Sequence, residues 1–281
     1  EPCSHYGKTP PCVNIIVKKK IKNVYYAFED PDTRTFRKAK KIFNRKGIKN
    51  KLINSKKYSQ FYKSYFVNKK SSIPFVTAKI AISKDYLTIN KKDKWITNES
   101  SRKIVHLLRS KYDCVLSTSK SINQDDSLLN CRIDGLNNNK PDLFIIDLKL
   151  KLKKKLSLNN YLKKRKIYLV TNKRNVRKTL VYKKLGYKII LIDQLKNKND
   201  FTFLYKKIYK IGYARMLIET GLTFINNLIK NKMIHDLYIF QSSKKLGNSG
   251  KNNDTTKYLK KTFPKLVTIN LNGDILLKKD F

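Results

Sequence analysis

The amino-acid sequence predicts two α/β domains joined by a short polar segment. Three observations lead to this fold class. Strand-like and helical patterns alternate over residues 24–66, small and polar residues gather at 68–72, and a longer alternating series follows. Alternation of this kind is typical of sheets covered by helices. A length of 281 residues also accommodates two modest domains.

The first domain is expected to contain two strands and two helices. In order, they are a strand at 24–28, a helix at 33–46, a strand at 48–53 and an aromatic-rich helix at 58–66. Asp30-Pro31-Asp32 is a turn signal between the first two elements. Gly47 follows the first helix, where a C-terminal cap belongs. The polar run Asn68–Ser72, just before Pro74, is then predicted to be the linker between the domains.

The second domain is expected to be larger. Its predicted strands lie at 75–83, 114–117, 143–147, 167–171, 188–192, 215–218 and 237–240, and its helices at 99–110, 176–185, 202–209 and 222–230. The end of the chain, around Asn272-Gly273, indicates a β-hairpin of residues 266–269 and 275–277. The Lys/Leu-rich stretch 149–158 is predicted to be a solvated connection.

The charge is strongly positive, with 64 Lys and Arg against 20 Asp and Glu, a net +44. Such a balance can indicate nucleic-acid binding, because clustered cations release counterions from phosphates. However, 54 of the cations are Lys, spread along the whole chain, and Asn, Ile, Tyr and Phe are also abundant. Compositional bias is therefore the favoured explanation, with a general attraction for anionic ligands.

Other classes of protein are disfavoured by simple counts. No apolar run approaches the roughly 18 residues of a membrane span, so no integral membrane protein is expected. Four cysteines without a secretory signal argue against a disulfide framework and favour a reducing cytoplasm. The chain opens on Glu1-Pro2-Cys3 without Met, as if its true start were missing. A homo-oligomer is left open.

Two Pro-Cys pairs near the N-terminus are the strongest local signal. Cys3 and Cys12 bracket a loop that contains His5 and Gly7. Two thiolates held at a fixed separation suit tetrahedral zinc, which zinc deaminases complete with a His and a nearby Glu. The alternative is two buried thiols. No G-x-G occurs among the nine glycines, so the common dinucleotide fingerprint is absent.

The motifs together resemble the bifunctional riboflavin-biosynthesis deaminase–reductase family. The segment 1–12, EPCSHYGKTPPC, resembles its deaminase signature. Four further segments match its reductase half in the right order: 79–85 (K-x-A-x-S-x-D), 95–97 (W-I-T), 125–132 (D-D-x-x-L-x-x-R) and 218–221 (resembling V-E-G-G). Residues 1–68 thus resemble the C-terminal part of a cytidine-deaminase-like zinc domain. Residues 69–281 resemble an NADPH-dependent reductase of the dihydrofolate-reductase-like fold.

The resemblance implies a function in riboflavin biosynthesis. In the family, the first domain deaminates a diaminopyrimidinone ribosylamino 5′-phosphate. The second domain reduces the ribosyl group of the product to ribityl with NADPH, by hydride delivery to the sugar C1′. The partner is thus a small phosphorylated pyrimidine, and a membrane or nucleic-acid partner is not implied. The His-x-Glu element, which supplies the third zinc ligand and the proton-shuttling Glu, is absent from this chain, so the deaminase half is expected to be inactive.

Site residues carry over from the matched motifs. The resemblance assigns NADPH contacts to Ile82, Trp95, Ser121, Asp125, Gly221, Leu222 and Thr223. It assigns substrate contacts to Asp93, Arg109, Leu129, Arg132 and Glu219, and zinc to Cys3 and Cys12. Lys79 is a weaker candidate for polarising the sugar or holding its phosphate. The chain departs from the family pattern at Tyr86, where Gly is usual, at Ser127 (Pro), at Asn130 (Thr) and at Asp93 (Ser).

Independent reasoning on the residues leaves plainer alternatives open. Glu219 follows an apolar run, which places it at the ligand-binding edge of a sheet or makes it an exposed strand-end charge. Trp95, the only Trp, is a core residue on priors alone. Arg109 and Arg132 are either surface cations or bidentate phosphate ligands. The rival function is a basic nucleic-acid-binding protein on a degenerate enzyme fold.

Overall fold

The computed structural model describes residues 1–53, 58, 61–136, 141–261 and 267–281. Within them the chain forms two compact units, Glu1–Phe75 and Val76–Phe281. Each unit is described by itself.

The first unit contains two parallel strands, β1 (Asn23–Tyr26) and β2 (Lys49–Leu52). Its helices are α1 (Cys12–Lys18), α2 (Lys38–Arg45) and α4 (Lys63–Ser71). Val13, Ala39, Phe43 and Ile48 form its small core. The predicted alternation of strands and helices is confirmed, although α1 was not predicted.

Two predicted elements of this unit have different bounds. Helix α2 begins only at Lys38, because Arg37 has a φ of 56°, a left-handed conformation through which an α-helix cannot run. The predicted helix 58–66 lies partly outside the described residues. The segment Asn68–Ser72, expected to be a polar linker, is helical up to Ser71, because Asn68–Ser71 are the last residues of helix α4. Polar residues suit a solvent-exposed helix end as well as they suit a linker, and α4 buries none of its residues.

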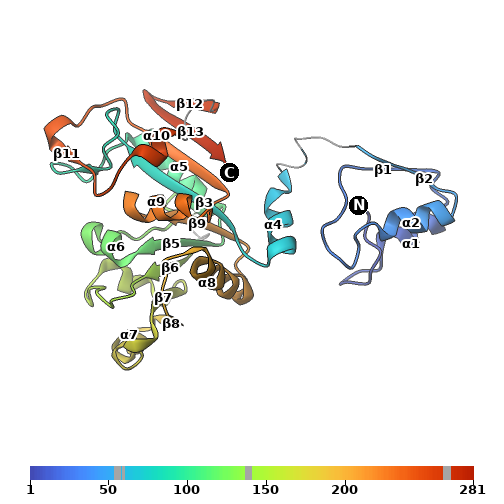
Figure 1. The fold of residues 1–281 in the computed structure, drawn as a ribbon, viewed down its shortest axis with the longest axis horizontal. Coiled ribbons are helices and arrows are strands. Elements are labelled where there is room, and N and C mark those ends of the chain that lie inside the picture. Colours follow the sequence, from blue (N-terminus) through green and yellow to red (C-terminus); the bar gives the residue numbers. More distant parts are fainter. Residues whose placement is uncertain (54–57, 59–60, 137–140, 262–266) are drawn as a thin grey trace. The chain divides into compact units, whose positions relative to one another are not determined.

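The second unit is built on a large mixed sheet. Among the described residues its strand order is β12-β13-β10-β3-β9-β5-β6-β7-β8, from top to bottom in Figure 1. The bounds are β3 Phe75–Ile82, β5 Cys114–Thr118, β6 Asp142–Ile146, β7 Ile167–Asn172, β8 Lys188–Ile192, β9 Arg215–Glu219, β10 Asp236–Gln241, β12 Val267–Leu271 and β13 Asp274–Asp280. A separate two-stranded pair joins β4 (Ile89–Asn90) to β11 (Gly250–Lys251).

The central strands are buried hydrophobic runs, as parallel strands covered on both faces should be. Strand β5 pairs in parallel with β9 and with β6, and β6 pairs in parallel with β7. The predicted hairpin at the end of the chain is confirmed, because β12 and β13 pair antiparallel on either side of Asn272-Gly273.

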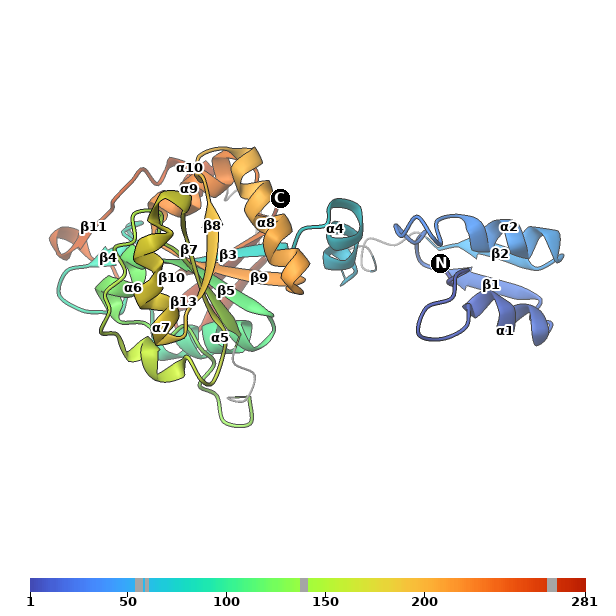
Figure 2. The same ribbon diagram turned by 90° about the horizontal axis from the view of Figure 1, so that it is seen from below.

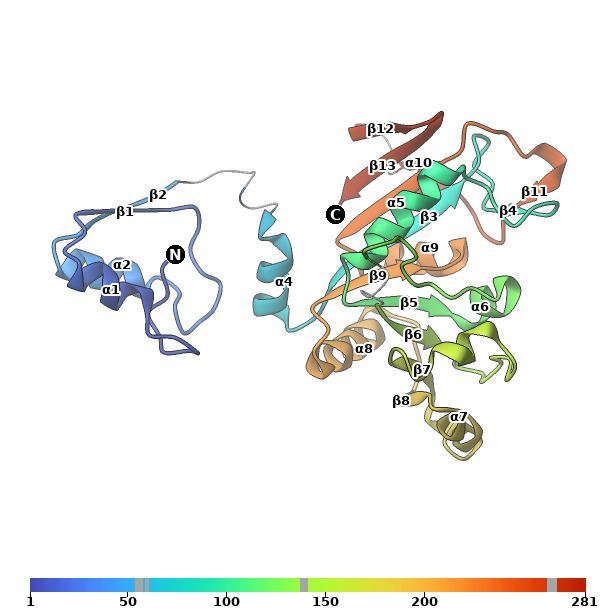
Figure 3. The ribbon, with the colours of Figure 1, turned by 180° about the vertical axis from the view of Figure 1, so that it is seen from behind.

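Helices cover both sides of this sheet. They are α5 (Glu99–Ser110), α6 (Ser119–Asp125), α7 (Leu180–Leu185), α8 (Lys198–Ile211), α9 (Leu222–Lys230) and α10 (Lys257–Lys261). Figure 2 shows α8 and α9 on one side of the sheet and α5 on the other, and Figure 3 shows α5 from its own side. The predicted bounds of α5, α9 and β8 agree with the structure. Helices α6 and α10 were not predicted.

Two further predictions need correction. The stretch 149–158 is not simply solvated, because Leu152 and Leu158 are buried in the main core. Its leucines alternate with exposed lysines. The high lysine content of the stretch therefore indicated solvent exposure, although individual leucines are buried. The predicted helix 176–185 is α-helical only from Leu180, after a 3-10 turn at Arg177–Thr179.

None of the helices in the described residues is long and apolar enough to cross a membrane.

Candidate functional site

A cavity of about 1120 Å³ lies where β5 and β9 end. The residues that follow these strands begin α6 and α9, so two helix N-termini face the same space. The side chain of Ser117 at the end of β5 donates to the backbone oxygen of Glu219 at 2.7 Å, which ties the two strand ends together. In open α/β sheets this edge is the usual place for ligands.

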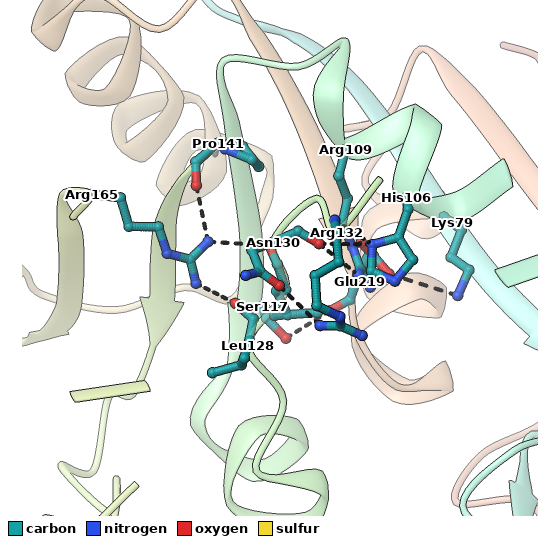
Figure 4. Close-up of polar contacts among 11 residues, drawn as sticks. Lys79, His106, Arg109, Ser117, Leu128, Asn130, Arg132, Pro141, Arg165 and Glu219 are labelled. Atoms are coloured by element: carbon teal, nitrogen blue, oxygen red, sulfur yellow. Dashed lines mark hydrogen bonds and ion pairs between the residues drawn. The ribbon is translucent and has the colours of Figure 1, made fainter. Parts of the chain in front are cut away.

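Three charged side chains form a buried cluster in the wall of this cavity. The guanidinium of Arg109 donates hydrogen bonds to both carboxylate oxygens of Glu219, from Nε at 2.6 Å and from a terminal nitrogen at 3.0 Å. The ammonium of Lys79 lies 3.7 Å from the same carboxylate. Figure 4 shows Lys79 and Arg109 converging on Glu219 from β3 and α5. The Glu219 side chain is only 7% exposed, so the alternative of a surface charge at a strand end is wrong.

Burial and charge act in opposite directions on the pKa values of this cluster. Burial alone would raise the pKa of Glu219, but Arg109 and Lys79 outweigh it and hold that pKa below its usual value. Burial lowers the pKa of Lys79, an effect that Arg109 reinforces and Glu219 opposes. The cluster therefore keeps its carboxylate ionised and makes Lys79 a better proton donor than an exposed lysine.

A loop segment, Leu128–Arg132, forms another wall. Asn130 is the best-held residue: its backbone oxygen accepts from Arg109 at 3.2 Å and lies 3.0 Å from the ring nitrogen Nδ1 of His106. The amide oxygen of Asn130 accepts from the Arg132 guanidinium at 2.9 Å. No carboxylate pairs with Arg132 among the described residues, so its remaining donors are available to an anionic ligand in the cavity.

His106 makes this site sensitive to acid. Burial first, and then Arg109 and Arg132, lower the pKa of His106 from 6.5 to about 4. Between these two pH values, the His106 side chain is protonated in the unfolded chain and neutral in the folded chain. The free energy of unfolding therefore falls as the pH drops through this range. We expect His106→Gln to lose less stability than the parent between about pH 7 and about pH 4.5, measured by urea unfolding. Equal losses in the two proteins would contradict the prediction.

The structure brings most of the predicted site residues to one place. The cavity is lined by Lys79 and by ten of the predicted nucleotide and substrate residues: Trp95, Arg109, Ser121, Asp125, Leu129, Arg132, Glu219, Gly221, Leu222 and Thr223. Ile82 and Asp93 do not line the cavity as the described residues form it. The Ile82 side chain is fully buried in β3, so only its backbone could meet a ligand. The Asp93 carboxylate accepts instead from the backbone N–H of Trp95 at 3.1 Å.

Trp95 is not a core residue, contrary to the expectation from its type. Its side chain is 46% exposed at the mouth of the cavity. The guanidinium of Arg102 lies over its ring at 4.9 Å, and the ammonium of Lys94 at 5.6 Å. Lys94 also donates to the backbone oxygen of Asp125 at 2.8 Å. A half-exposed ring held in this way offers a flat apolar surface to a planar ligand.

A second cavity of about 560 Å³ shares Lys120 and Gln124 with the first. It is lined by three more exposed lysines, Lys149, Lys151 and Lys153. The loop that carries them is well held, since both backbone N–H groups of Lys151 and Leu152 donate to the Asp147 carboxylate at 2.9 and 2.7 Å. The arrangement favours an anion.

The Pro-Cys pairs do converge. The two Sγ atoms of Cys3 and Cys12 are 3.3 Å apart, and the backbone N–H of Cys12 donates to Cys3 Sγ at 3.2 Å. The His5 ring is taken up elsewhere, 2.8 Å from the Thr35 hydroxyl. Across the described residues, no three His, Cys, Asp or Glu side chains are grouped as metal ligands would be. Two thiols alone fall short of a closed zinc site.

Tyr86 stands where the family motif has Gly, and its φ is 63°. This left-handed conformation suits Gly and is unfavourable for an aromatic residue. The departure seen in the sequence therefore places an aromatic residue in a conformation that glycine would adopt without strain.

Sequence reasoning missed several residues of the site. His106, Ser117 and Arg165 are absent from the predicted site, and Asn130 appears in the prediction only as a departure from the motif. A signal existed for His106, which lies three residues before Arg109 and so shares its helix face. Asn130 acts through its backbone oxygen, which no residue pattern reveals.

Comparisons with known proteins match this chain to one family and fold. Residues 74–270 match the family described as the RibD C-terminal domain. The riboflavin biosynthesis protein RibD of Buchnera aphidicola is 29% identical over 270 residues, 89% of this chain and 70% of that protein. The structure of RibD from Acinetobacter baumannii superposes with a TM-score of 0.78 at 24% identity, over 99% of this chain and 78% of that one. A diaminohydroxyphosphoribosylaminopyrimidine deaminase/5-amino-6-(5-phosphoribosylamino)uracil reductase from Thermotoga maritima does so with 0.78 at 22% identity, over 99% and 76%. The two structural likenesses show a shared fold.

Proposed function

Since this chain belongs to the family of the RibD C-terminal domain, we propose that it is a reductase of riboflavin biosynthesis. Its substrate is 5-amino-6-(5-phosphoribosylamino)uracil, which is reduced with NADPH to the ribityl form. The observation that carries the proposal is the buried Lys79–Glu219–Arg109 cluster in a cavity that also exposes two helix N-termini. Residues 69–281 form the reductase domain in this proposal, and residues 1–68 the end of a deaminase domain.

The residues of the cavity fit a dinucleotide. Helix α9 begins directly after Gly221, so its free backbone N–H groups can bind a phosphate. Thr118 caps α6 by accepting from the backbone N–H of Ser121 at 3.3 Å, which places Ser121 and Asp125 along the same wall. Gly221 has a φ of −72° and open space around its missing Cβ, so the protein backbone itself does not require Gly there. Close approach of a ligand would.

The opposite wall fits a phosphorylated sugar. Arg132 offers guanidinium donors, Leu129 an apolar contact, and Lys79 an ammonium directed to the cavity. When bound, NADPH supplies the hydride that reduces C1′ of the ribosyl group. Glu219 holds Arg109 and Lys79 in place, and Lys79 is positioned to donate a proton or hydrogen bond to a sugar oxygen. The lowered pKa of Lys79 suits that transfer.

The direct test uses the whole chain. We expect NADPH binding by calorimetry, together with consumption of NADPH that depends on the ribosylaminopyrimidine phosphate. A well-folded sample that binds no NADPH would refute the proposal. Tight DNA binding that weakens steeply with salt near physiological ionic strength would favour the nucleic-acid rival instead.

The second cavity gives a test of cofactor choice. In this proposal, its lysines bind the extra phosphate that distinguishes NADPH from NADH. Replacing Lys149, Lys151 and Lys153 together by Gln should weaken NADPH binding about threefold to a hundredfold, at about 0.2–1 kcal/mol for each of the three exposed ionic contacts. NADH binding should change little. The matched control replaces three exposed lysines of α8, Lys198, Lys206 and Lys210, by Gln and should leave both affinities unchanged. A parallel loss for NADPH and NADH would show that these lysines do not read that phosphate.

The deaminase half is proposed to be inactive in this chain. Cys3 and Cys12 supply two zinc ligands, and the family's proton-shuttling Glu has no counterpart here. We expect substoichiometric zinc by metal analysis and no deamination of 2,5-diamino-6-ribosylamino-4(3H)-pyrimidinone 5′-phosphate, because no hydroxide is positioned to attack the ring. Stoichiometric zinc with turnover would contradict this expectation.

A further inference from the structure

Arg165 is a buried cation that does not touch the cavity. It precedes β7, and the residue is only 6% exposed. Burial lowers the pKa of Arg165 to about 10, so the guanidinium stays charged at neutral pH. No carboxylate forms an ion pair with it within the described part of the chain, and its Nε has no partner there. Burying a charge without a partner of opposite charge lowers the stability of the fold. An apolar residue would serve better at this position if packing were the only requirement.

Every hydrogen bond of Arg165 that the structure shows goes to a backbone oxygen. One terminal nitrogen donates to Leu129 at 3.2 Å and to Pro141 at 3.0 Å. The other donates to Leu128. Figure 4 shows the guanidinium of Arg165 directed toward Leu128 and Pro141, on the side of the segment away from Glu219. The planar fork of arginine can hold several carbonyl oxygens at once, which a lysine cannot match.

The segment that Arg165 holds is Leu128–Arg132, of which Leu128, Leu129 and Arg132 line the cavity. Leu129 has a φ of 51°, a left-handed conformation that an unsupported leucine avoids. One residue later, the backbone oxygen of Asn130 meets Arg109 and His106. The segment is therefore held from outside by Arg165 and from inside by Arg109 and His106.

We propose that Arg165 is a positioning residue for substrate binding, which fixes the strained turn at Leu129 so that Leu129 and Arg132 face the cavity. This inference rests on the proposed function, because it assigns the Leu128–Arg132 segment to the substrate side. The residue touches neither substrate nor cofactor and acts through the segment it holds.

The first measurement reads the segment directly and requires no activity. Cys131 lies inside the segment and is 1% exposed, whereas Cys114 lies in β5 and is fully buried. In Arg165→Met we expect iodoacetamide to alkylate Cys131 at least about tenfold faster than in the parent, read by peptide mass spectrometry, while Cys114 stays protected. Arg165→Lys should give an intermediate rate. Arg177→Met, at an exposed arginine that lines neither cavity, should leave the rate unchanged.

The second measurement is kinetic. Arg165→Met should raise the KM for the ribosylaminopyrimidine phosphate about tenfold and leave the Kd for NADPH within about twofold. Arg165→Lys should recover part of the loss. A role confined to stability would lower the melting temperature of both variants without this division between substrate and cofactor.

The outcomes separate the two proposals. If the parent neither binds NADPH nor reduces the substrate, the proposed function fails, and the alkylation rates still decide whether Arg165 holds the segment. Unchanged Cys131 protection in Arg165→Met would overturn the inference. If Arg165→Met does not fold, the same alkylation measurement is made on Arg165→Lys. Equal alkylation of Cys131 and Cys114 in that variant would overturn the inference, because Arg165 would then support the whole core.

Discussion

Glu219→Gln should be the most damaging conservative substitution in the second unit. The amide cannot balance the charges of Arg109 and Lys79, which would be left buried without a carboxylate. Removing one partner of a buried ion pair costs about 3–5 kcal/mol. In a unit of this size, we expect a melting temperature lower by about 6–20 °C, measured by calorimetry. We also expect kcat/KM to fall about tenfold to a hundredfold, with NADPH affinity much less affected.

The structure changes the reason for this prediction. The sequence suggested that the Glu219 carboxylate accepts hydrogen bonds from the substrate, whereas both of its oxygens are already bound by Arg109. The activity loss would then come through displaced Arg109 and Lys79. Asp193→Asn is the matched control, because Asp193 forms an exposed ion pair with Lys173 and lines neither cavity, and it should alter neither stability nor turnover appreciably. Turnover within twofold of the parent in folded Glu219→Gln would remove Glu219 from the site.

Lys79→Met should separate turnover from stability. The ammonium is desolvated and only loosely held at 3.7 Å from Glu219, which retains its two bonds to Arg109 after the change. We expect the melting temperature to stay the same or rise, because a buried cation is removed. If Lys79 donates to the sugar, kcat should fall at least about a hundredfold, the usual range for a general acid.

Lys84→Met provides the comparison for Lys79→Met. Lys84 lies just beyond the same strand and is exposed. It should keep the parent's kcat. Stopped-flow measurement of NADPH oxidation with saturating substrate distinguishes the two variants. A kcat for Lys79→Met within about threefold of the parent would exclude a proton-donating role and leave Lys79 as part of the ion cluster.

The sequence alone predicted much of the second unit. The bounds of α5, α9 and β8 agree with the structure because each begins and ends with its own local signal. For α5, Asn98 caps the first turn by accepting from the Ser101 N–H at 2.9 Å, and apolar residues recur at helical spacing after it. Of the residues that the family motifs assigned to the cofactor and substrate, all but Ile82 and Asp93 line the cavity.

The failures occurred where local composition and tertiary burial disagree. The run Asn68–Ser71 is polar enough for a linker yet completes a helix, and the stretch 149–158 is rich in lysine yet inserts Leu152 and Leu158 into the core. Helix α6 was missed because it contains few apolar residues, of which Ile122 is fully buried. Its start is fixed by the strand before it, not by its own periodicity.

What the sequence by itself determined is therefore the series of elements and the types of residue available to the site. What only the tertiary structure decided is which side chains and backbone atoms these residues contact. Glu219 and Arg109 stand 110 positions apart in sequence and meet because β9 pairs with β5 beside α5. Arg165 reaches the backbone oxygens of Leu128 and Leu129, and a backbone oxygen has no sequence signature. Hydrophobic periodicity is a local property of the chain, whereas the pairing of buried charges depends on which strands become neighbours in the sheet.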